Sequence, residues 1–298
     1  SFSKYVFKDY SDDILNNGVK AAIDKSTSTV YVSVNEGQLS DGDFLAGLLD
    51  LSASDEMFFG VFDADRIEAM RKNQPLKMII AEKDSDEYMQ YDLILTTIPV
   101  INLDGGNIGE DSQGRDLNGG DFSIWSAEES LPLQTSSVHW HVRGGSSSKY
   151  DKTSFKLSFK KRYEDNDMTF LDMGSDDEWI LNAMVVDDTK VREKFAMDIW
   201  NQMQKTNKYG VKMSIGEYVE VVINGKYQGL YLLQRQINEK YLELDDDAIL
   251  LRGVDSWTPA SADEAYTIKY SIGMTDKEIY DKMNGLFTMT DFSLLDID

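Results

Sequence analysis

The 298-residue chain contains no cysteine, which excludes disulfide bonds, thiolate nucleophiles and cysteine-ligated metal sites together. It also lacks any apolar run near the ~18 residues that read as a membrane helix, so no membrane span is expected. Positive charge is scarce: 30 Lys and Arg stand against 53 Asp and Glu, for a formal net charge of −23. Such a surface repels phosphate backbones and anionic lipids, so nucleic acid is not an expected partner.

Hydrophobic residues nevertheless make up 41% of the chain and aromatic residues 11%, which is enough to bury a real core. The length fits one large domain or two of ordinary size. The lack of cysteine suits a secreted bacterial protein as well as a cytosolic one. The chain begins at Ser1 rather than at methionine, so we expect that an upstream segment was removed.

Apolar and polar residues alternate in several stretches of residues 1–95, at the two-residue period of a half-buried strand. The alternation is clearest in Val19–Ile23, Val30–Val34, Leu76–Ile80 and Tyr91–Leu95. Short strands at this spacing predict a small antiparallel β-sandwich, resembling the immunoglobulin-like modules that precede larger domains on bacterial surface proteins. A different pattern begins near Ile98-Pro99, and we place a domain boundary between residues 95 and 96.

Two stretches raise the possibility of a bound metal ion. Residues 104–121 are rich in glycine and acid and are predicted to form a long loop, with calcium-type ligands at Asp104, Asn107, Glu110, Asp111 and Asp116. The DxDxDG spacing of a calcium loop is missing, which favours a solvated loop. His139 and His141 would share one face of a strand and could bind zinc, but without a third ligand nearby, packing or hydrogen bonding explains them better. No metal ligands are assigned.

A glycine- and serine-rich turn lies between two predicted strands, Val138–Val142 and Phe155–Phe159. Gly144 and Gly145 permit positive φ and a close approach of the backbone to a ligand. The cations around the turn are Arg143, Lys149, Lys152 and Lys156. Backbone N–H groups, hydroxyls and fixed cations are what a phosphate needs, although a serine-rich loop solvated by lysines is the more common meaning of such a pattern.

Two further elements are well marked. Asp187, Asp188 and Thr189 supply capping side chains for a helix that runs to about Lys205. Its apolar residues recur every fourth position, and we expect this face to lie in the core: Val191, Phe195, Ile199 and Met203. Later, Asn224-Gly225 is the preferred pair for a type I′ turn and predicts a two-residue hairpin.

Three motifs together resemble the spore-coat protein H (CotH) family of atypical protein kinases. They are Arg143-Gly-Gly-Ser-Ser-Ser with Lys152-Thr-Ser-Phe-Lys, Trp179-Ile-Leu with Asp187-Asp-Thr-Lys-Val-Arg192, and Tyr218-Val-Glu-Val-Val-Ile-Asn-Gly225-Lys-Tyr-Gln-Gly229-Leu-Tyr-Leu-Leu. Their order and spacing match the family, and the likeness covers residues 96–298. The expected fold is α+β: a β-sandwich over residues 1–95, then a CotH-like, kinase-like β-rich lobe with packed helices over residues 96–298, incomplete at its C-terminus.

The resemblance implies a protein that binds ATP with Mg or Mn and phosphorylates serines on extracytoplasmic or coat proteins, at the bacterial surface. It places the phosphates near the turn formed by Gly144, Gly145, Ser146 and Ser147. Lys152 is then the phosphate-contacting lysine, and Arg143 and Arg192 belong to the same site, with Arg192 buttressing the loop.

Two departures from the family pattern bear on activity. The family typically carries a glutamate where this chain has Arg235, and that charge reversal puts nucleotide contacts near the second hairpin in doubt. The Asn-x-Asp and Trp-Asp-x-Asp segments that hold the family's catalytic and metal-binding aspartates are not found here, so no catalytic residue is assigned. Two functions follow as hypotheses: a CotH-type kinase seen as an inactive piece, or a non-catalytic surface or coat scaffold.

Overall fold

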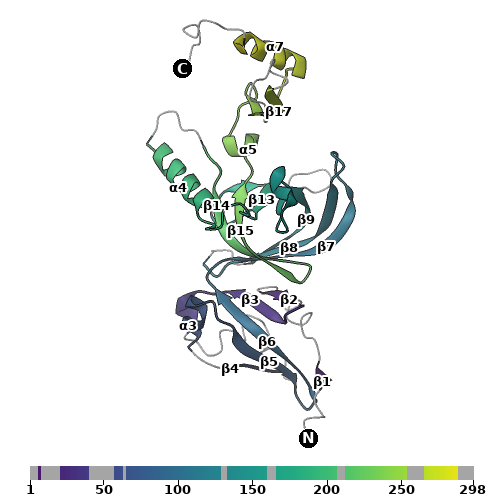
Figure 1. Ribbon diagram of the computed structural model, residues 1–298, viewed down its shortest axis with the longest axis vertical. Coiled ribbons are helices and arrows are strands. Elements are labelled where there is room, and N and C mark those ends of the chain that lie inside the picture. The colour runs from purple at the N-terminus through teal and green to yellow at the C-terminus, as the bar shows by residue number, and fades with distance from the viewer. Residues whose placement is uncertain are drawn as a thin grey trace. The chain divides into compact units, whose positions relative to one another are not determined.

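The computed structural model describes residues 6–7, 21–39, 57–62, 65–128, 133–159, 166–206, 212–253 and 265–287 (Figure 1). The chain divides into two compact units, Ser1–Arg235 and Gln236–Asp298. The described residues are rich in β-strand, with few helices, and form mixed sheets and one closed barrel.

The N-terminal strands form one mixed sheet in the order β2-β3-β6-β5-β4, with β1 beside β6. Their bounds are β1 Val6–Phe7, β2 Ala22–Asp24, β3 Thr29–Ser33, β4 Met57–Phe62, β5 Leu76–Glu82 and β6 Glu87–Thr96. The pairs β3–β6 and β1–β6 are parallel, so the expectation of a purely antiparallel arrangement was wrong. Alternation along a strand shows that one face is buried, but it does not show which strand lies alongside.

A helix, α3 (Arg66–Arg71), packs on the core of this sheet through Ala69 and Met70. Asp65 caps it, because its Oδ1 accepts hydrogen bonds from the N–H groups of Ile67 and Glu68 at 3.0 and 3.2 Å. The described N-terminal strands form a single sheet, and the immunoglobulin-like assignment is not confirmed.

Seven strands close into a barrel in the order β10-β13-β15-β14-β7-β8-β9. Their bounds are β7 Val100–Glu110, β8 Asp116–Trp125, β9 Leu133–Arg143, β10 Ser154–Ser158, β13 Glu178–Asn182, β14 Gly216–Ile223 and β15 Lys226–Arg235; β11 (Met168–Thr169) and β12 (Ser175–Asp176) form a separate pair. Aromatic rings fill the interior: Phe122 lies edge-on to Phe159, with ring centroids 5.0 Å apart, and Phe170 packs on Trp179 at 4.9 Å. The barrel is therefore a packed core rather than a channel.

The change from the first sheet to the barrel falls at residues 97–99, between β6 and β7, while both belong to the first compact unit. The division into domains at residues 95 and 96 stays a prediction.

The predicted loop at residues 104–121 was wrong, because these residues form most of the β7–β8 hairpin. Gly105 pairs with Gly120, and a Cβ at Gly105 would collide with the carbonyl oxygen of Gly119. The glycines that suggest a loop are instead the residues that let two strands come this close.

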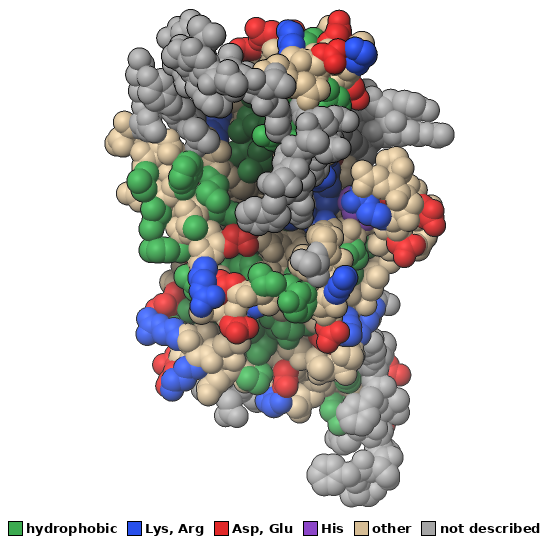
Figure 2. Space-filling view, turned by 45° about the horizontal axis from the view of Figure 1, so that its top comes forward, with side chains coloured by type: hydrophobic (Ala, Val, Ile, Leu, Met, Phe, Trp, Pro, Cys, Tyr) green, Lys and Arg blue, Asp and Glu red, His purple; other side chains and the backbone are tan. Residues whose placement is uncertain are grey.

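Helix α4 (Arg192–Gln204) packs on the outside of the barrel through Met197, which clusters with Met184 and Leu232. The prediction that the apolar stripe of this helix lies in the core was wrong. Phe195 is 61% exposed and Met203 62%, and Val191, Ile199 and Trp200 are exposed as well. In Figure 2, hydrophobic side chains reach the surface on the left of the view, the side on which Figure 1 places α4.

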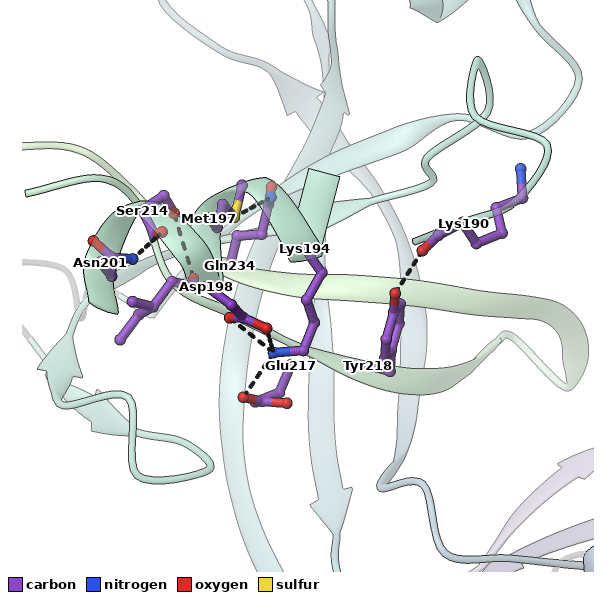
Figure 3. Close-up of polar contacts among 10 residues, drawn as sticks. Lys190, Lys194, Met197, Asp198, Asn201, Ser214, Glu217, Tyr218 and Gln234 are labelled. Carbon is purple, nitrogen blue, oxygen red and sulfur yellow. Dashed lines mark hydrogen bonds and ion pairs between the residues drawn. The ribbon is translucent and has the colours of Figure 1, made fainter. Parts of the chain in front are cut away.

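The face of α4 that meets the barrel is held largely by polar contacts (Figure 3). The Nδ2 of Asn201 donates to the carbonyl oxygen of Ser214 at 3.1 Å. The Nζ of Lys194 lies 3.1 Å from the Oε1 of Glu217 and 3.2 Å from the Oδ2 of Asp198. Buried polar groups need such partners, so a half-polar face can be the buried one.

The second unit holds a two-stranded sheet and two helices: β16 (Ile249–Gly253), β17 (Tyr266–Ser271), α5 (Glu239–Leu242) and α7 (Asp276–Phe287). Thr275 and Glu278 form a capping box at the start of α7: the N–H of Thr275 donates to Glu278 Oε2 at 2.8 Å, and the N–H of Glu278 donates to Thr275 Oγ1 at 3.3 Å. None of the helices described is long and apolar enough to cross a membrane.

Candidate functional site

The glycine–serine turn joins β9 to β10 through a short 3-10 helix at Ser146–Lys149. Gly144 has φ +114°, and a Cβ there would strike the hydroxyl oxygen of Ser147. Gly145 ends the bend, and its carbonyl oxygen accepts a hydrogen bond from the hydroxyl of Ser148 at 2.7 Å. The turn therefore requires glycine at residue 144 and is held in shape by its own groups.

Arg143 is the last residue of β9 and lies half-buried near Glu193 of α4. Burial lowers the pKa of the Arg143 guanidinium, and the charge of Glu193 opposes this shift. The carboxylate of Glu193 accepts from the Nδ2 of Asn182 at 2.7 Å and from the Nε2 of Gln234 at 2.9 Å. The structure thus brings β9, β13, β15 and the first turn of α4 together around one cation and one carboxylate.

Arg192 points elsewhere. Its side chain is 74% exposed, and its Nη1 lies 3.6 Å from the Oδ1 of Asp187. The N-cap residue of α4 is Val191, which makes no side-chain cap, so the capping predicted for Asp187, Asp188 and Thr189 is met only in part: the Oδ2 of Asp187 accepts from the N–H of Arg192 at 2.8 Å. Within the described residues Arg192 makes no hydrogen bond to the glycine–serine turn, so contacts of this kind do not support its expected role as a buttress.

Lys152 is held by β15 on the way from the turn to β10. Its Nζ donates to the carbonyl oxygen of Leu230 at 2.5 Å and lies 4.3 Å from the ring centroid of Tyr231. Gly229, at φ +87°, leaves room, since a Cβ there would sit 3.4 Å from this nitrogen. Burial lowers the pKa of Lys152 and Lys190 lowers it further, while the charge of Glu220 opposes both.

Glu220 and Tyr227 complete the surroundings of Lys152, and neither was singled out from the sequence. The hydroxyl of Tyr227 donates to the Oε2 of Glu220 at 2.5 Å. Burial raises the pKa of Glu220, and the hydrogen bond from Tyr227 and the charge of Lys152 oppose that shift. A signal was available: Glu220 is the one acid within the apolar run Val219–Ile223.

Of the suspected metal ligands, Asn107 and Asp116 are in contact, because the Nδ2 of Asn107 donates to the Oδ1 of Asp116 at 3.3 Å. Asp111 accepts from Arg115, whose hydrogen bonds lower the pKa of Asp111 to about 2, and the two residues close the tip of the β7–β8 hairpin. His139 is exposed, whereas His141 is half-buried, and burial lowers the pKa of His141. The part of the chain that the structure describes holds no group of three or more His, Asp or Glu side chains suited to a metal ion.

Arg235 lies inside the barrel rather than at a ligand-facing surface. Its Nη2 lies 2.9 Å from the Oδ2 of Asp176, and its Nη1 donates to the carbonyl oxygen of Met173 at 2.8 Å. Both charged side chains are buried, with 6% and 0% of their surface exposed. The reversed charge at this position is thus matched by a buried partner.

These features define a class: a closed β-barrel with one helix packed on its outer face and a glycine turn flanked by two half-buried cations, Arg143 and Lys152, near its rim. Residues 140–287 match the family model described as CotH kinase protein. Residues 140–287 are therefore a CotH-family region, and the recognition made from the three motifs is confirmed. A comparison with curated proteins gave no match.

Proposed function

We propose that this chain is the phosphate-holding part of a CotH-type protein kinase and binds ATP at the rim of the barrel. The observation that carries the proposal is the setting of Lys152, whose ammonium group is partly desolvated and fixed by Leu230 and Tyr231 within the region that matches the family. A partly desolvated, pre-positioned cation interacts with phosphate oxygens more strongly than a solvated one does.

Several residues would contribute to phosphate binding. Lys152 and Arg143 supply positive charge, and Gly144 and Gly145 let the backbone approach the phosphates. Mg or Mn would neutralise phosphate charge, but the carboxylates seen in the described residues are not gathered to hold such an ion. No step is therefore assigned to a metal, and the acceptors we propose are serine-rich coat or surface proteins.

A second function, a non-catalytic surface or coat scaffold, is favoured by a different observation. Arg235 stands where the family typically has glutamate, and its guanidinium pairs with the buried carboxylate of Asp176. The charge of Arg235 is therefore neutralised within the fold and is not offered to a ligand.

Calorimetric titration with ATP separates the two functions. We expect ATP to bind the wild-type chain and Lys152→Ala to weaken binding roughly tenfold or more, the loss of one charge-assisted hydrogen bond. Lys83→Ala is the matched control, because it removes the same charge from an exposed turn of the N-terminal sheet. Competition by inorganic tripolyphosphate would show that the phosphates are what is recognised.

Two outcomes would count against ATP binding at this site. Equal weakening in both variants would mean that only net charge matters. No binding to the wild-type chain would leave the scaffold function as the better account.

A further inference from the structure

The turn of the β14–β15 hairpin is hydrogen-bonded to the N-terminal sheet. The N–H of Lys25 donates to the carbonyl oxygen of Gly225 at 2.8 Å, and the N–H of Tyr227 donates to the Oδ2 of Asp24 at 3.0 Å. Asp24 is itself fixed, because its Oδ1 accepts from the N–H and the hydroxyl of Ser26 at 2.9 and 2.6 Å. The hairpin that carries Tyr227 is thus anchored from outside the barrel.

Tyr227 connects the N-terminal sheet to Glu220. One face of its ring stacks on Tyr31 of β3, with centroids 4.2 Å apart and an interplanar angle of 13°. Its hydroxyl reaches the carboxylate of Glu220 at 2.5 Å. Tyr31 and Tyr227 also pack against a small buried cluster formed by Ala22, Val100 and Val222.

Glu220 in turn acts on Lys152. Glu220 pairs across the strands with Leu230, whose carbonyl oxygen holds the Nζ of Lys152. The charged groups that act on Lys152 are Lys190, from the loop before α4, and Glu220, from β14. Glu220 is therefore the negative charge that offsets the burial of Lys152 and the charge of Lys190.

We propose that the N-terminal sheet positions the Lys152 site, through Tyr31 and Asp24 acting on Tyr227 and through Tyr227 acting on Glu220. The sheet lies outside residues 140–287, so the matched region does not supply this support by itself. That the site serves phosphate binding rests on the proposed function; the chain of contacts does not. Tyr31, Tyr227 and Glu220 are positioning residues here.

The test measures the ionisation of Lys152 in the full chain without nucleotide. The rate at which an amine-reactive reagent labels Lys152 is followed by mass spectrometry as a function of pH. In Tyr227→Phe the ring remains but the hydroxyl is lost, so the Glu220 carboxylate loses the hydrogen bond that fixes its position and acts less strongly on Lys152. We expect the pH midpoint for labelling of Lys152 to fall by about half a pH unit.

The two tyrosines should respond differently to substitution. Tyr31→Phe keeps the stacking and should leave the midpoint unchanged, whereas Tyr31→Ala should lower it as Tyr227→Phe does. Trp125→Phe is the matched control, because it removes another tie to the N-terminal sheet, the 2.7 Å hydrogen bond from Trp125 Nε1 to the carbonyl oxygen of Ser33.

An unchanged or raised midpoint in Tyr227→Phe would overturn the proposal, and so would an equal fall in Trp125→Phe. The calorimetric titration distinguishes this failure from failure of the proposed function. If ATP binds through Lys152 but the labelling midpoint of Lys152 does not shift, only the positioning by the N-terminal sheet is refuted. If the midpoint shifts but ATP does not bind, only the nucleotide site is refuted.

Discussion

Replacing Asp176 by asparagine should destabilise the barrel strongly, because the guanidinium of Arg235 then stays buried beside a neutral partner. Both side chains are almost fully buried, and the pair distance is 2.9 Å. Breaking such a pair from one side costs about 3–5 kcal/mol. Asparagine keeps an oxygen for the N–H of Glu178, which donates to Asp176 Oδ1 at 3.0 Å, so the loss measures the charge rather than the local turn.

Arg235→Met should cost a similar amount, because it leaves the carboxylate of Asp176 buried without its cation. The double variant should cost clearly less than the sum of the two single variants, with a coupling of about 2–3 kcal/mol. The assay is denaturant unfolding followed by tryptophan fluorescence. Lys77→Met and Asp92→Asn form the matched control cycle at a surface pair on β5 and β6, with side chains 49% and 33% exposed.

The surface cycle should couple by about 1 kcal/mol or less and weaken further with added salt. The buried pair should show little salt dependence, because no solvent lies between its charges. A cost below about 1 kcal/mol for Asp176→Asn, or strictly additive variants, would mean that water reaches the pair and that the barrel interior is not the dry core described above.

Three further outcomes are expected. Met197→Ala should destabilise the chain by about 2–4 kcal/mol, and Phe195→Ala by less than about 0.5 kcal/mol; equal costs in thermal unfolding would mean that α4 buries its apolar stripe after all. Gly225→Val and Asn224→Ala should each cost about 1 kcal/mol or more, because residues 224 and 225 have φ +50° and +67°; unchanged melting in both would refute the type I′ turn. Labelled ATP with Mg or Mn and a serine-rich acceptor should give no incorporation above background, and robust incorporation abolished by Lys152→Ala would show that catalytic carboxylates were overlooked.

Local patterns in the sequence were sufficient where the forces are local. Asn224-Gly225 forms its turn because both residues tolerate positive φ, and the alternation in Leu76–Ile80 marks a strand whatever lies beside it. The family likeness and the hydrogen bond from Arg192 N–H to Asp187 at the start of α4 likewise depend on residue types at fixed spacing.

Tertiary structure decided everything that depends on a distant partner. A four-residue period groups Phe195 with Met203 on one face of α4, but the barrel determines that the face with Met197 is the buried one. Glycines at residues 105 and 120 suit a loop or a close strand pair equally well until the partner strand is known. The surroundings of Lys152 combine side chains from β14, β15 and the N-terminal sheet, and no spacing along the chain encodes which of them meet, because the barrel closure and the inter-sheet contacts bring them together.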